Sequence, residues 1–356
     1  YNVQDGLSDH TINCILEDDE GFLWLGTTKG LNKFDRKKQV FTKYTDLPGD
    51  SSSLYYNQIN SLIQTRDGKI WLGTGAGLYE FDKKTEVFSI FLGTGQEYYS
   101  PRSNYILNLL EDDKGIIWVS TTFGLIKFDP RTKRSARYYH VPGDKSSLSH
   151  NNVRFVCQER SGNFWIGTRS GLNYFDTTTQ TIRQFFYSKD DLTSIGDNWI
   201  RVIYEDCSGQ IWIGTESGGL NLYDKVNDRF IRYQNVLNNK SSLSNNRIYS
   251  IFEDNTGNLW IGTYNGVNKI DKYYNNFEHY QRTSNDYRSL NDNIIWAFEE
   301  DDQNNLWIGT SSGVNIMNKQ TGQFDYLTND PGNPGSIAGN DIRTILFTPE
   351  YNCIWL

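Results

Sequence analysis

The chain has 356 residues, with 31 Gly, 23 Tyr, 19 Phe and 10 Trp but a single Met, which is a composition typical of soluble β proteins. Its formal net charge of −8 excludes a general nucleic-acid or anionic-membrane surface, because both require a basic face. A local basic pocket is still compatible with this charge. No apolar stretch approaches the roughly 20 residues that a membrane-spanning helix needs.

A four-residue phrase, Trp-(Leu/Ile/Val)-(Gly/Ser)-Thr, recurs through the whole sequence. The complete copies begin at Trp24, Trp71, Trp118, Trp165, Trp212, Trp260 and Trp307. An eighth copy begins at Trp355, and the successive spacings are 47, 47, 47, 47, 48, 47 and 48 residues. Self-similarity at one period over nearly the whole chain predicts a repeat protein rather than the two or three unrelated domains that length alone suggests.

The second unit shows the predicted elements of one repeat in chain order. Residues 57–63, 70–74, 78–82 and 87–90 are short runs rich in apolar residues, and each is predicted to be a strand. The breaks between them carry Gly, Asp or Lys-Thr, the chemistry of short hairpin loops. Four strands leave no room for a helix, so each unit is predicted to be a four-stranded antiparallel sheet.

The second strand of this unit is apolar on both of its faces. Ile70 and Leu72 alternate with Trp71 and the small Gly73. A strand that is dry on both sides belongs to a sheet lying between two other sheets. A radial arrangement provides this for every copy, so the predicted fold class is all-β, a β-propeller of four-stranded antiparallel blades.

The number of blades depends on the two ends of the chain. Residues 1–339 are predicted to form a seven-bladed propeller, and residues 1–3 resemble the end of a fourth strand. Residues 340–356 supply the first strands of an eighth repeat, which would either start a second propeller or take part in ring closure. Seven blades are preferred, and eight are the alternative.

Several positions fixed within the repeat have a structural interpretation. An asparagine opens the predicted first strand, and its short amide is expected to bond to backbone and close the incoming loop. The positions are Asn57, Asn104, Asn151, Asn198, Asn246, Asn293 and Asn340. Cys14 and Cys157 fall in predicted strands and are interpreted as small buried residues rather than as disulfide partners.

Positions that differ between units are free to serve a ligand. Two sets differ most: residues flanking the fixed Ile of the first strand, and the turn after Trp-Ile-Gly-Thr. In a propeller both sets are expected around the mouth of the central channel, where aromatic rings suit sugar faces and arginines suit hydroxyl, carboxylate or sulfate groups. The candidate ligand-binding residues are Arg154, Arg169, Trp199, Arg201, Arg247, Tyr249, Tyr264 and Trp296. The alternative is that these side chains only fill the channel or the gaps between blades.

The unit as a whole resembles a known repeat. The pattern Asn-x-Ile-x-x-Ile-x-Glu-Asp-x-x-Gly-x-x-Trp-Ile-Gly-Thr followed by Gly-Leu-x-x-Phe-Asp resembles the two-component regulator propeller repeat, with residues 197–215 and 245–263 as close matches. The third unit departs from it at Val119-Ser120, and the seventh has Asn304 where the first turn usually has Gly.

The resemblance implies a place in a larger protein. Such repeats build the periplasmic sensor of hybrid two-component systems, in which two seven-bladed propellers and a β-sandwich precede a membrane helix and a cytoplasmic histidine kinase. This chain looks like the first propeller of such a sensor. The resemblance implies an oligosaccharide ligand bound without cleavage, contacts with the second propeller and β-sandwich of the same protein, and a homodimer. It implies no nucleic acid, and a membrane only through a segment outside this sequence.

Two other function classes are weighed against this one. A propeller lyase or glycosidase would need converging carboxylates or a Tyr/His base at the channel mouth, where Glu216 is the acid that the sequence places. A purely structural or protein-docking propeller would bind no small ligand. Four scattered histidines and acidic first turns such as residues 17–20, interpreted as solvated, predict no catalytic residue, no metal site and no cofactor.

Overall fold

The computed structural model of the protein describes residues 3–45, 54, 58–92, 105–271, 276–283, 286 and 289–356. Seven four-stranded antiparallel sheets follow one another along the chain, each with its strands in sequence order. The prediction of an all-β propeller fold with seven four-stranded blades is confirmed. Short 3-10 turns occur at η1 (Val3–Asp5) and η3 (Pro349–Tyr351), so Val3 is not part of a strand as predicted. No described helix is both long and apolar enough to traverse a lipid bilayer.

The strands of blades one to four have the following bounds. Blade one is β1 (Ile12–Glu17), β2 (Leu23–Thr27), β3 (Gly30–Asp35) and β4 (Val40–Tyr44); blade two is β5 (Ile59–Gln64), β6 (Ile70–Thr74), β7 (Leu78–Asp82) and β8 (Val87–Ile90). Blade three is β9 (Ile106–Glu111), β10 (Ile117–Thr121), β11 (Gly124–Asp129) and β12 (Arg134–Tyr138); blade four is β13 (Val153–Gln158), β14 (Phe164–Thr168), β15 (Leu172–Asp176) and β16 (Thr181–Phe185).

The remaining strands continue the same order. Blade five is β17 (Ile200–Glu205), β18 (Ile211–Thr215), β19 (Leu220–Asp224) and β20 (Arg229–Tyr233); blade six is β21 (Ile248–Glu253), β22 (Leu259–Thr263), β23 (Gly266–Asp271) and β24 (Asn276–Tyr280). Blade seven is β25 (Ile295–Glu300), β26 (Asn305–Thr310), β27 (Gly313–Asn318) and β28 (Phe324–Leu327). The hairpin β29 (Leu346–Thr348) and β30 (Cys353–Trp355) follows. Whether residues 340–356 start a second propeller or take part in ring closure stays a prediction.

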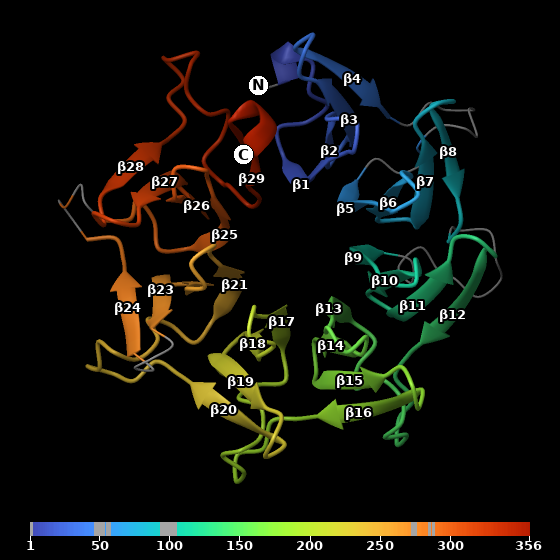
Figure 1. Ribbon diagram of the computed structural model, residues 1–356, viewed down its shortest axis with the longest axis vertical. Coiled ribbons are helices and arrows are strands. Elements are labelled where there is room, and N and C mark those ends of the chain that lie inside the picture. The colour runs from blue at the N-terminus through green and yellow to red at the C-terminus, as the bar shows by residue number, and fades with distance from the viewer. Residues whose placement is uncertain are drawn as a thin grey trace. The chain divides into compact units, whose positions relative to one another are not determined.

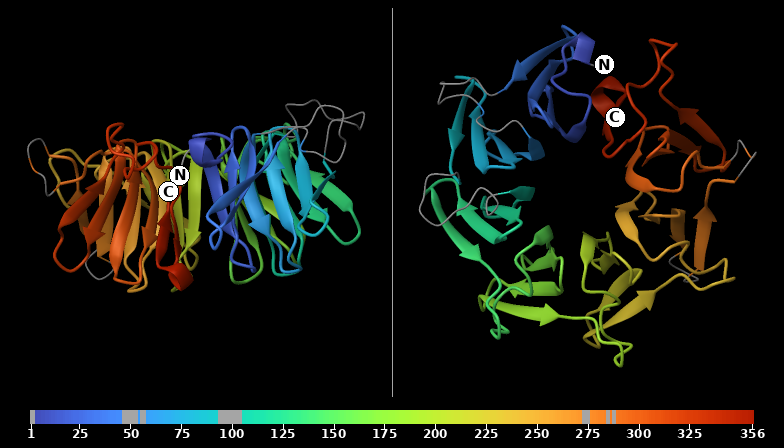
Figure 2. Two further views of the ribbon diagram at one scale, coloured as in Figure 1. Left: turned by 90° about the horizontal axis from the view of Figure 1, so that it is seen from above. Right: turned by 180° about the vertical axis from the view of Figure 1, so that it is seen from behind.

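The chain divides into two compact units. Unit one comprises residues 1–169 and 173–184, and unit two comprises residues 170–172 and 185–356. Within each unit the first strands of successive blades lie side by side (Figure 1). In each blade the strands run between two opposite ends of the sheet (Figure 2). We call the end where first strands begin and second strands finish the loop end, and the opposite end the turn end.

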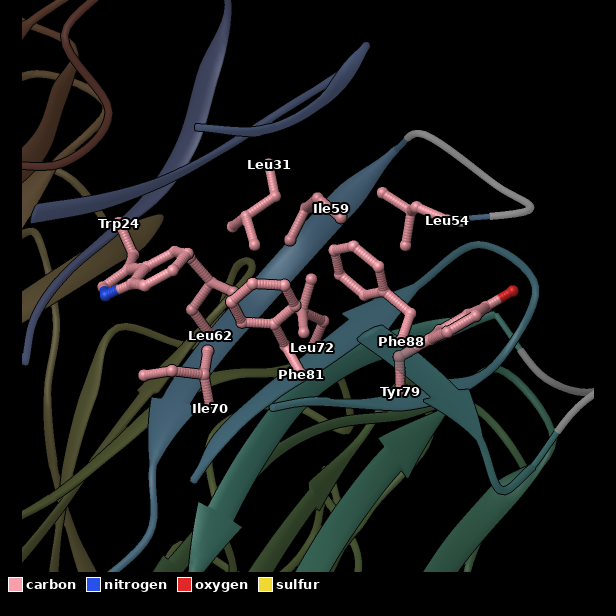
Figure 3. Packing of buried hydrophobic residues seen from close by; sticks show 10 residues of the cluster. All are labelled: Trp24, Leu31, Leu54, Ile59, Leu62, Ile70, Leu72, Tyr79, Phe81 and Phe88. Atoms are coloured by element: carbon pink, nitrogen blue, oxygen red, sulfur yellow. The ribbon is translucent and has the colours of Figure 1, made fainter. Parts of the chain in front are cut away.

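The second strands form the core of each blade. All five residues of β2, β6, β10, β14, β18 and β22 are buried, as the apolar pattern on both faces predicts. The ring of Trp24 lies 5.2 Å from that of Phe81 in blade two, inside a cluster with Leu62 and Ile70 (Figure 3). The tryptophan therefore joins its blade to the next one, and truncating one to Ala is expected to cost roughly 3–5 kcal/mol.

The glycine of the repeated phrase has a steric role between blades. A Cβ on Gly26 would lie 2.7 Å from Cγ2 of Ile59, and one on Gly73 would lie 2.5 Å from Cγ2 of Ile106. The first-strand isoleucine of the following blade thus occupies the space that any larger side chain would need. The small residue is required by this close approach.

In six of the seven blades an acidic residue six positions before the tryptophan accepts a hydrogen bond from the indole. Asp112 Oδ2 accepts a 2.8 Å hydrogen bond from Trp118 Nε1, and Oδ1 accepts two backbone N–H groups at 2.9 Å. The same indole bond is made by Asp18, Glu159, Asp206, Asp254 and Asp301. The interpretation of the acidic turns as solvated is therefore wrong for Asp18, Asp112 and Asp301, which are buried as acceptors. Blade two has Thr65 at this position, and Trp71 Nε1 has no hydrogen-bond partner among the described residues.

The asparagine that opens each first strand closes the incoming loop, as predicted. In blades four to seven and in the eighth repeat, its Oδ1 accepts a backbone N–H eleven residues earlier, for example from His140 to Asn151 at 2.7 Å. Its own carbonyl accepts the N–H of the turn glycine in the preceding blade, as Asn151 does from Gly124 at 2.5 Å. Asn57 and Asn104 lie outside the described residues.

Successive blades are also connected at the turn end. The first N–H after the indole-binding residue donates to a Gln or Glu at the end of the next blade's first strand. Examples are Arg66 N to Glu111 Oε2 at 3.0 Å and Cys207 N to Glu253 Oε2 at 2.7 Å. In these five blades the first turn is thus fixed by a residue about 45 positions further along the chain.

No disulfide joins the four cysteines, which all lie within the described residues. Cys14, Cys157, Cys207 and Cys353 are all free thiols, and burial raises the pKa of Cys14 to about 12.

Burial of Asp9 opposes its ionisation, but hydrogen bonds from Lys29 (2.7 Å) and from the Thr11 N–H (2.9 Å) outweigh it and lower the pKa of Asp9 to about 2.

Candidate functional site

A β-bulge near the start of each first strand sets the position of the candidate side chains. In blade five Ile200 pairs with Thr215 and Val202 with Gly214, so Arg201 between them is the extra residue. The same irregularity leaves out Tyr249 in blade six and Trp296 in blade seven. A bulge re-aims its unpaired side chain, and here it does so at the loop end of the innermost hairpin of each blade.

In unit two the bulge residues stack on one another from blade to blade. The Arg201 guanidinium carbon lies 4.8 Å from the centre of the Tyr249 ring, and this ring lies 4.6 Å from that of Trp296. The guanidinium carbon of Arg343, the equivalent residue of the eighth repeat, lies 5.1 Å from the centre of the Trp296 ring. We call Arg201, Tyr249, Trp296 and Arg343 the arginine–aromatic ladder. Cation–π contacts of this kind hold guanidinium planes against rings.

In blades one and two of unit one the same bulge positions have a structural use. Asn13 donates from Nδ2 to the carbonyl of Ile59, and Asn60 donates to the carbonyl of Ile106, both at 2.8 Å. These bonds tie each blade to the next. Rings and guanidiniums replace this amide in blades five to seven, so the ladder is not a requirement of the blade.

A glutamate beside the ladder binds two arginines. Glu216 Oε2 pairs with Arg201 Nε, and Glu216 Oε1 lies 2.8 Å from Arg247 Nε. The Arg247 guanidinium carbon also lies 5.1 Å from the centre of the Tyr264 ring. Hydrogen bonding to Tyr249, together with the charge of Glu216, raises the pKa of Arg247. We call Arg201, Glu216 and Arg247 the glutamate clamp.

The blade-five turn that carries Glu216 contains an extra residue. Thr215 Oγ1 bonds to the carbonyl of Gly219, four residues on, whereas the equivalent bond in other blades spans three. A Cβ on Gly218 would lie 2.2 Å from the carbonyl carbon of Gly196, so the longer turn fits only against another glycine. Ser217 then bonds to Asp197 Oδ2 through its N–H (2.8 Å) and hydroxyl (2.7 Å). These contacts fix the turn that carries Glu216.

The site is partly open to solvent. The side chains of Glu216 and Arg201 are 15% and 22% exposed, Arg247 is 40% exposed, and Tyr264 is 46% exposed. Trp296 is fixed through its Nε1, which donates to Ser311 Oγ at 3.0 Å. The arrangement therefore combines held ring faces with charged groups that a ligand can reach.

The structure brings six of the eight predicted residues together. Trp199, Arg201, Arg247, Tyr249, Tyr264 and Trp296 all lie in unit two at the loop end, and the Arg201 guanidinium carbon is 5.6 Å from the Trp199 ring centre. Arg154, the blade-four bulge residue, and Arg169, in the turn after β14, lie exposed in unit one. Their membership of one cluster with the other six, and a position around a channel mouth, stay predictions.

Two contributors were missed by the sequence analysis. Glu216 was weighed as the acid of a propeller enzyme, and neither Glu216 nor Arg343 was among the eight candidate ligand-binding residues. The spacing of 48 residues between Trp212 and Trp260, one more than in the preceding units, could have indicated the longer blade-five turn. Arg343 could have been found because it occupies the same repeat position as Arg201, Tyr249 and Trp296.

An acidic turn with cation-site geometry is filled by a lysine. The carboxylates of Asp18, Asp19 and Glu20 offer ligand atoms within 4.8 Å of one another. Lys83 Nζ lies 2.7 Å from both Asp19 and Glu20 and 3.5 Å from Asp18. Burial disfavours the charged ammonium, but its hydrogen bonds to Asp19 and Glu20 dominate and raise the pKa of Lys83. The ammonium takes the place that a metal ion would need.

A pocket of about 620 Å³ lies at the turn end of unit two. Its lining includes Glu253, Asp254, Glu300 and Asp301. These groups already serve the fold: Asp254 and Asp301 bind indoles, Glu253 and Glu300 accept inter-blade N–H groups, and Lys319 pairs with Asp254 and Glu300. The loop-end ladder is therefore the better candidate for ligand binding.

Six of the repeat units match one family model, described as the two-component regulator propeller. The matched residues are 6–29, 56–76, 100–123, 147–170, 242–265 and 289–312. These units are two-component regulator propeller repeats. Residues 197–215, expected to be a close match, are not in a matched range, and the longer blade-five turn follows directly after them.

Solved structures share the fold of this regulator propeller. The extracellular domain of the hybrid two-component system BT3049 from B. thetaiotaomicron aligns at 24% identity with a TM-score of 0.65, covering 100% of this chain and 51% of that one. PorZ of Porphyromonas gingivalis, a surface component of the type-IX secretion system, aligns at 16% identity with a TM-score of 0.60, covering 99% and 59%. Virginiamycin B lyase from Staphylococcus aureus aligns at 12% identity with a TM-score of 0.54, covering 83% and 90%. The regulator propeller thus spans about half the length of the BT3049 domain. No curated protein sequence matches the chain.

Proposed function

We propose that the regulator propeller is a ligand-binding module in the extracytoplasmic sensor of a hybrid two-component system. Its repeats are those of the two-component regulator propeller, and its fold is that of an extracellular domain of such a system. In this proposal the module recognises an oligosaccharide outside the cytoplasm, in the periplasm. The signal passes to a cytoplasmic histidine kinase in the same full-length protein.

The single observation that carries the ligand proposal is the arginine–aromatic ladder. The adjacent rings of Tyr249 and Trp296, tilted at 53° to each other, offer apolar surface for sugar rings, and Arg201 and Arg343 bracket them with hydrogen-bond donors. The equivalent positions of blades one and two hold asparagines that serve only the fold. A site assembled from an arginine and two rings on strands of three neighbouring blades is pre-organised for binding.

Isothermal titration of the purified chain against a panel of oligosaccharides tests this proposal. For a saccharide that binds, Trp296→Ala is expected to weaken affinity by roughly tenfold or more, because stacking on an aromatic ring is worth about 1–3 kcal/mol per ring. Arg201→Ala should also weaken it. The matched controls are Phe186→Ala and Arg229→Ala. Phe186 is an exposed ring outside the ladder, and Arg229, on the outer strand β20, pairs with Asp224. Saccharide binding that no ladder substitution changes would contradict the proposed location.

The propeller-enzyme alternative is less well supported by the same geometry. A glycosidase needs two carboxylates flanking the scissile bond, one of them able to donate a proton. Glu216 is held by two arginines, and Asp341 pairs with Arg343 at 3.0 Å. We infer that the module binds its ligand without cleaving it. An assay for new reducing ends or unsaturated uronates, run with each saccharide that binds, checks this inference.

A further inference from the structure

The glutamate clamp contains two arginines and one carboxylate. Two guanidiniums face one carboxylate, so Arg201, Arg247 and Glu216 together carry one net positive charge. This excess lies in a chain whose formal net charge is −8. Blades one and two place neutral asparagines at the bulge, so the blade itself does not need the charge.

The clamp also holds more hydrogen-bond donors than the protein uses. Arg201 reaches Glu216 through Nε, and its two Nη groups make no hydrogen bond to any residue in the described part of the chain. Arg247 likewise approaches Glu216 through Nε. A guanidinium presents five N–H donors in one plane, and the Nη groups form the edge suited to bidentate binding of a carboxylate or sulfate.

Stacking on rings occupies the faces of the guanidiniums rather than that edge. The faces of Arg201 and Arg247 are taken by Tyr249 and Tyr264, at 4.8 and 5.1 Å from the guanidinium carbons. Ring contacts fix the plane of each guanidinium, and the hydrogen bond from Arg247 to Tyr249 uses one of its five donors. Glu216 in turn fixes the two guanidiniums relative to each other, and the extra turn residue holds Glu216 through Ser217 and Asp197. The donors are thus oriented before any ligand arrives.

We propose that the saccharide bound at the ladder carries an anionic group, a uronate carboxylate or a sulfate ester, which Arg201 and Arg247 bind through their Nη groups. This inference rests on the proposed function, because it assigns a chemical class to the ligand of the same site. The anion completes the neutralisation that Glu216 begins, while Tyr249, Tyr264 and Trp296 contact the sugar rings. A neutral saccharide of the same length would leave the charge excess unbalanced.

Titration with three matched probes tests the proposal: a galacturonate tetramer, a neutral galactose tetramer and a sulfated galactan tetramer. We expect the chain to bind one or both acidic probes at least roughly tenfold more tightly than the neutral one, with affinity falling as salt is raised. Preference for galacturonate assigns a carboxylate, and preference for the sulfated probe assigns a sulfate. Arg247→Gln and Arg201→Gln are each expected to reduce acidic-probe affinity roughly tenfold or more and neutral-probe affinity less than about threefold. Arg229→Gln is the matched control.

The failures of the two proposals are distinguishable. Equal binding of neutral and acidic probes, lost in Trp296→Ala but kept in both glutamine variants, would overturn the anionic assignment and leave the saccharide site standing. No binding of any saccharide would overturn both. Because Arg201 is mostly buried, its glutamine variant is checked for an unchanged unfolding midpoint. The more exposed Arg247 gives the same test with little effect on folding.

Discussion

Thr65 in blade two and Asp112 in blade three occupy the same position, six residues before the tryptophan. Exchanging these two residue types tests how much the hydrogen bond between the acid and the indole contributes to stability. In Asp112→Thr, blade three takes the residue that blade two has naturally. Asp112 is buried and accepts three hydrogen bonds, from Trp118 Nε1 and from the N–H groups of Lys114 and Ile116. With Thr65 in blade two, the corresponding indole has no acceptor among the described residues, so the hydroxyl does not substitute for the carboxylate.

The expected loss follows from these three bonds. A hydrogen bond to a charged acceptor contributes about 1.5–3 kcal/mol, and the threonine recovers part of the loss while relieving the cost of burying a charge. We expect Asp112→Thr to lower the free energy of unfolding by about 2–4 kcal/mol. With an unfolding entropy of roughly 2.1 cal/mol/K per residue, this lowers the melting temperature by about 3–5 °C if the chain unfolds cooperatively. The reciprocal Thr65→Asp should raise stability by about 1 kcal/mol, less than the loss because Asp67 lies two residues away and repels the new charge.

Calorimetry and urea unfolding of both variants measure these opposite shifts. The matched control is Asp302→Asn, an exposed acid in the blade-seven turn that should change the melting temperature by less than about 1 °C. The reasoning is refuted if Asp112→Thr melts with the control, or if Thr65→Asp is destabilising by as much as Asp112→Thr. Because repeat proteins can unfold in steps, the midpoint and the slope are compared together.

Three further predictions concern acid stability, thiol reactivity and the blade-five turn. The pKa of Asp9 is depressed to about 2 in the folded protein, so its contribution is present above its ordinary value near 4 and is lost as pH falls through 2; urea titrations should show Asp9→Asn less stable by about 2 kcal/mol at pH 6 and equal to wild type near pH 2. The exposed Cys207 should react with iodoacetamide in the native protein while Cys14, with its pKa raised to about 12, reacts only on unfolding, as followed by peptide mass spectrometry; early labelling of Cys14 would show that its strand opens. Gly218→Ala should displace the Glu216 turn and reduce the affinity for any ladder ligand together with stability, whereas Gly339→Ala, where an added Cβ meets nothing within 4 Å, should change neither; unchanged binding in Gly218→Ala would remove the turn from the site.

Much of the fold could be predicted because each element is written seven times. The tryptophan phrase marks the buried second strand, and the turn residues within each interval divide the rest of it into short strands. The asparagine before the first strand was predicted from its chemistry to close the loop, and the 2.7 Å bond from His140 N to Asn151 shows this directly. Repetition turns a weak local signal into a strong one.

The acidic turns were misinterpreted because the role of the buried acid depends on a tryptophan side chain six residues further along the chain. In sequence, Asp112 and Asp113 look alike, two adjacent acids in a turn. In the structure Asp112 lies beneath the indole of Trp118, while Asp113 is exposed and bonds to Gln158 of the next blade. Which of two neighbours points inward is set by hairpin geometry that composition alone does not contain.

The candidate site was found in outline and missed in its connections. Variation between units picked out Arg201, Tyr249 and Trp296 without indicating that a bulge turns all three into one row. The clamp was missed because its three residues are far apart in the sequence, and only the folded chain brings Glu216 to both Arg201 and Arg247. Charges that neutralise one another across blades can be recognised only when the strands are placed side by side.

The hydrogen bonds at the turn end have a consequence for synthesis on the ribosome. The Arg66 N–H cannot donate to Glu111, nor the Cys207 N–H to Glu253, until the acceptor residue has been synthesised. Such a first turn therefore gains its acceptor only after about 45 further residues have been made. At translation rates of roughly 5–20 residues per second, a newly made blade stays incomplete for about 2–9 seconds. We expect nascent chains to become protected from protease in steps of one repeat, with the last translated blade always the vulnerable one.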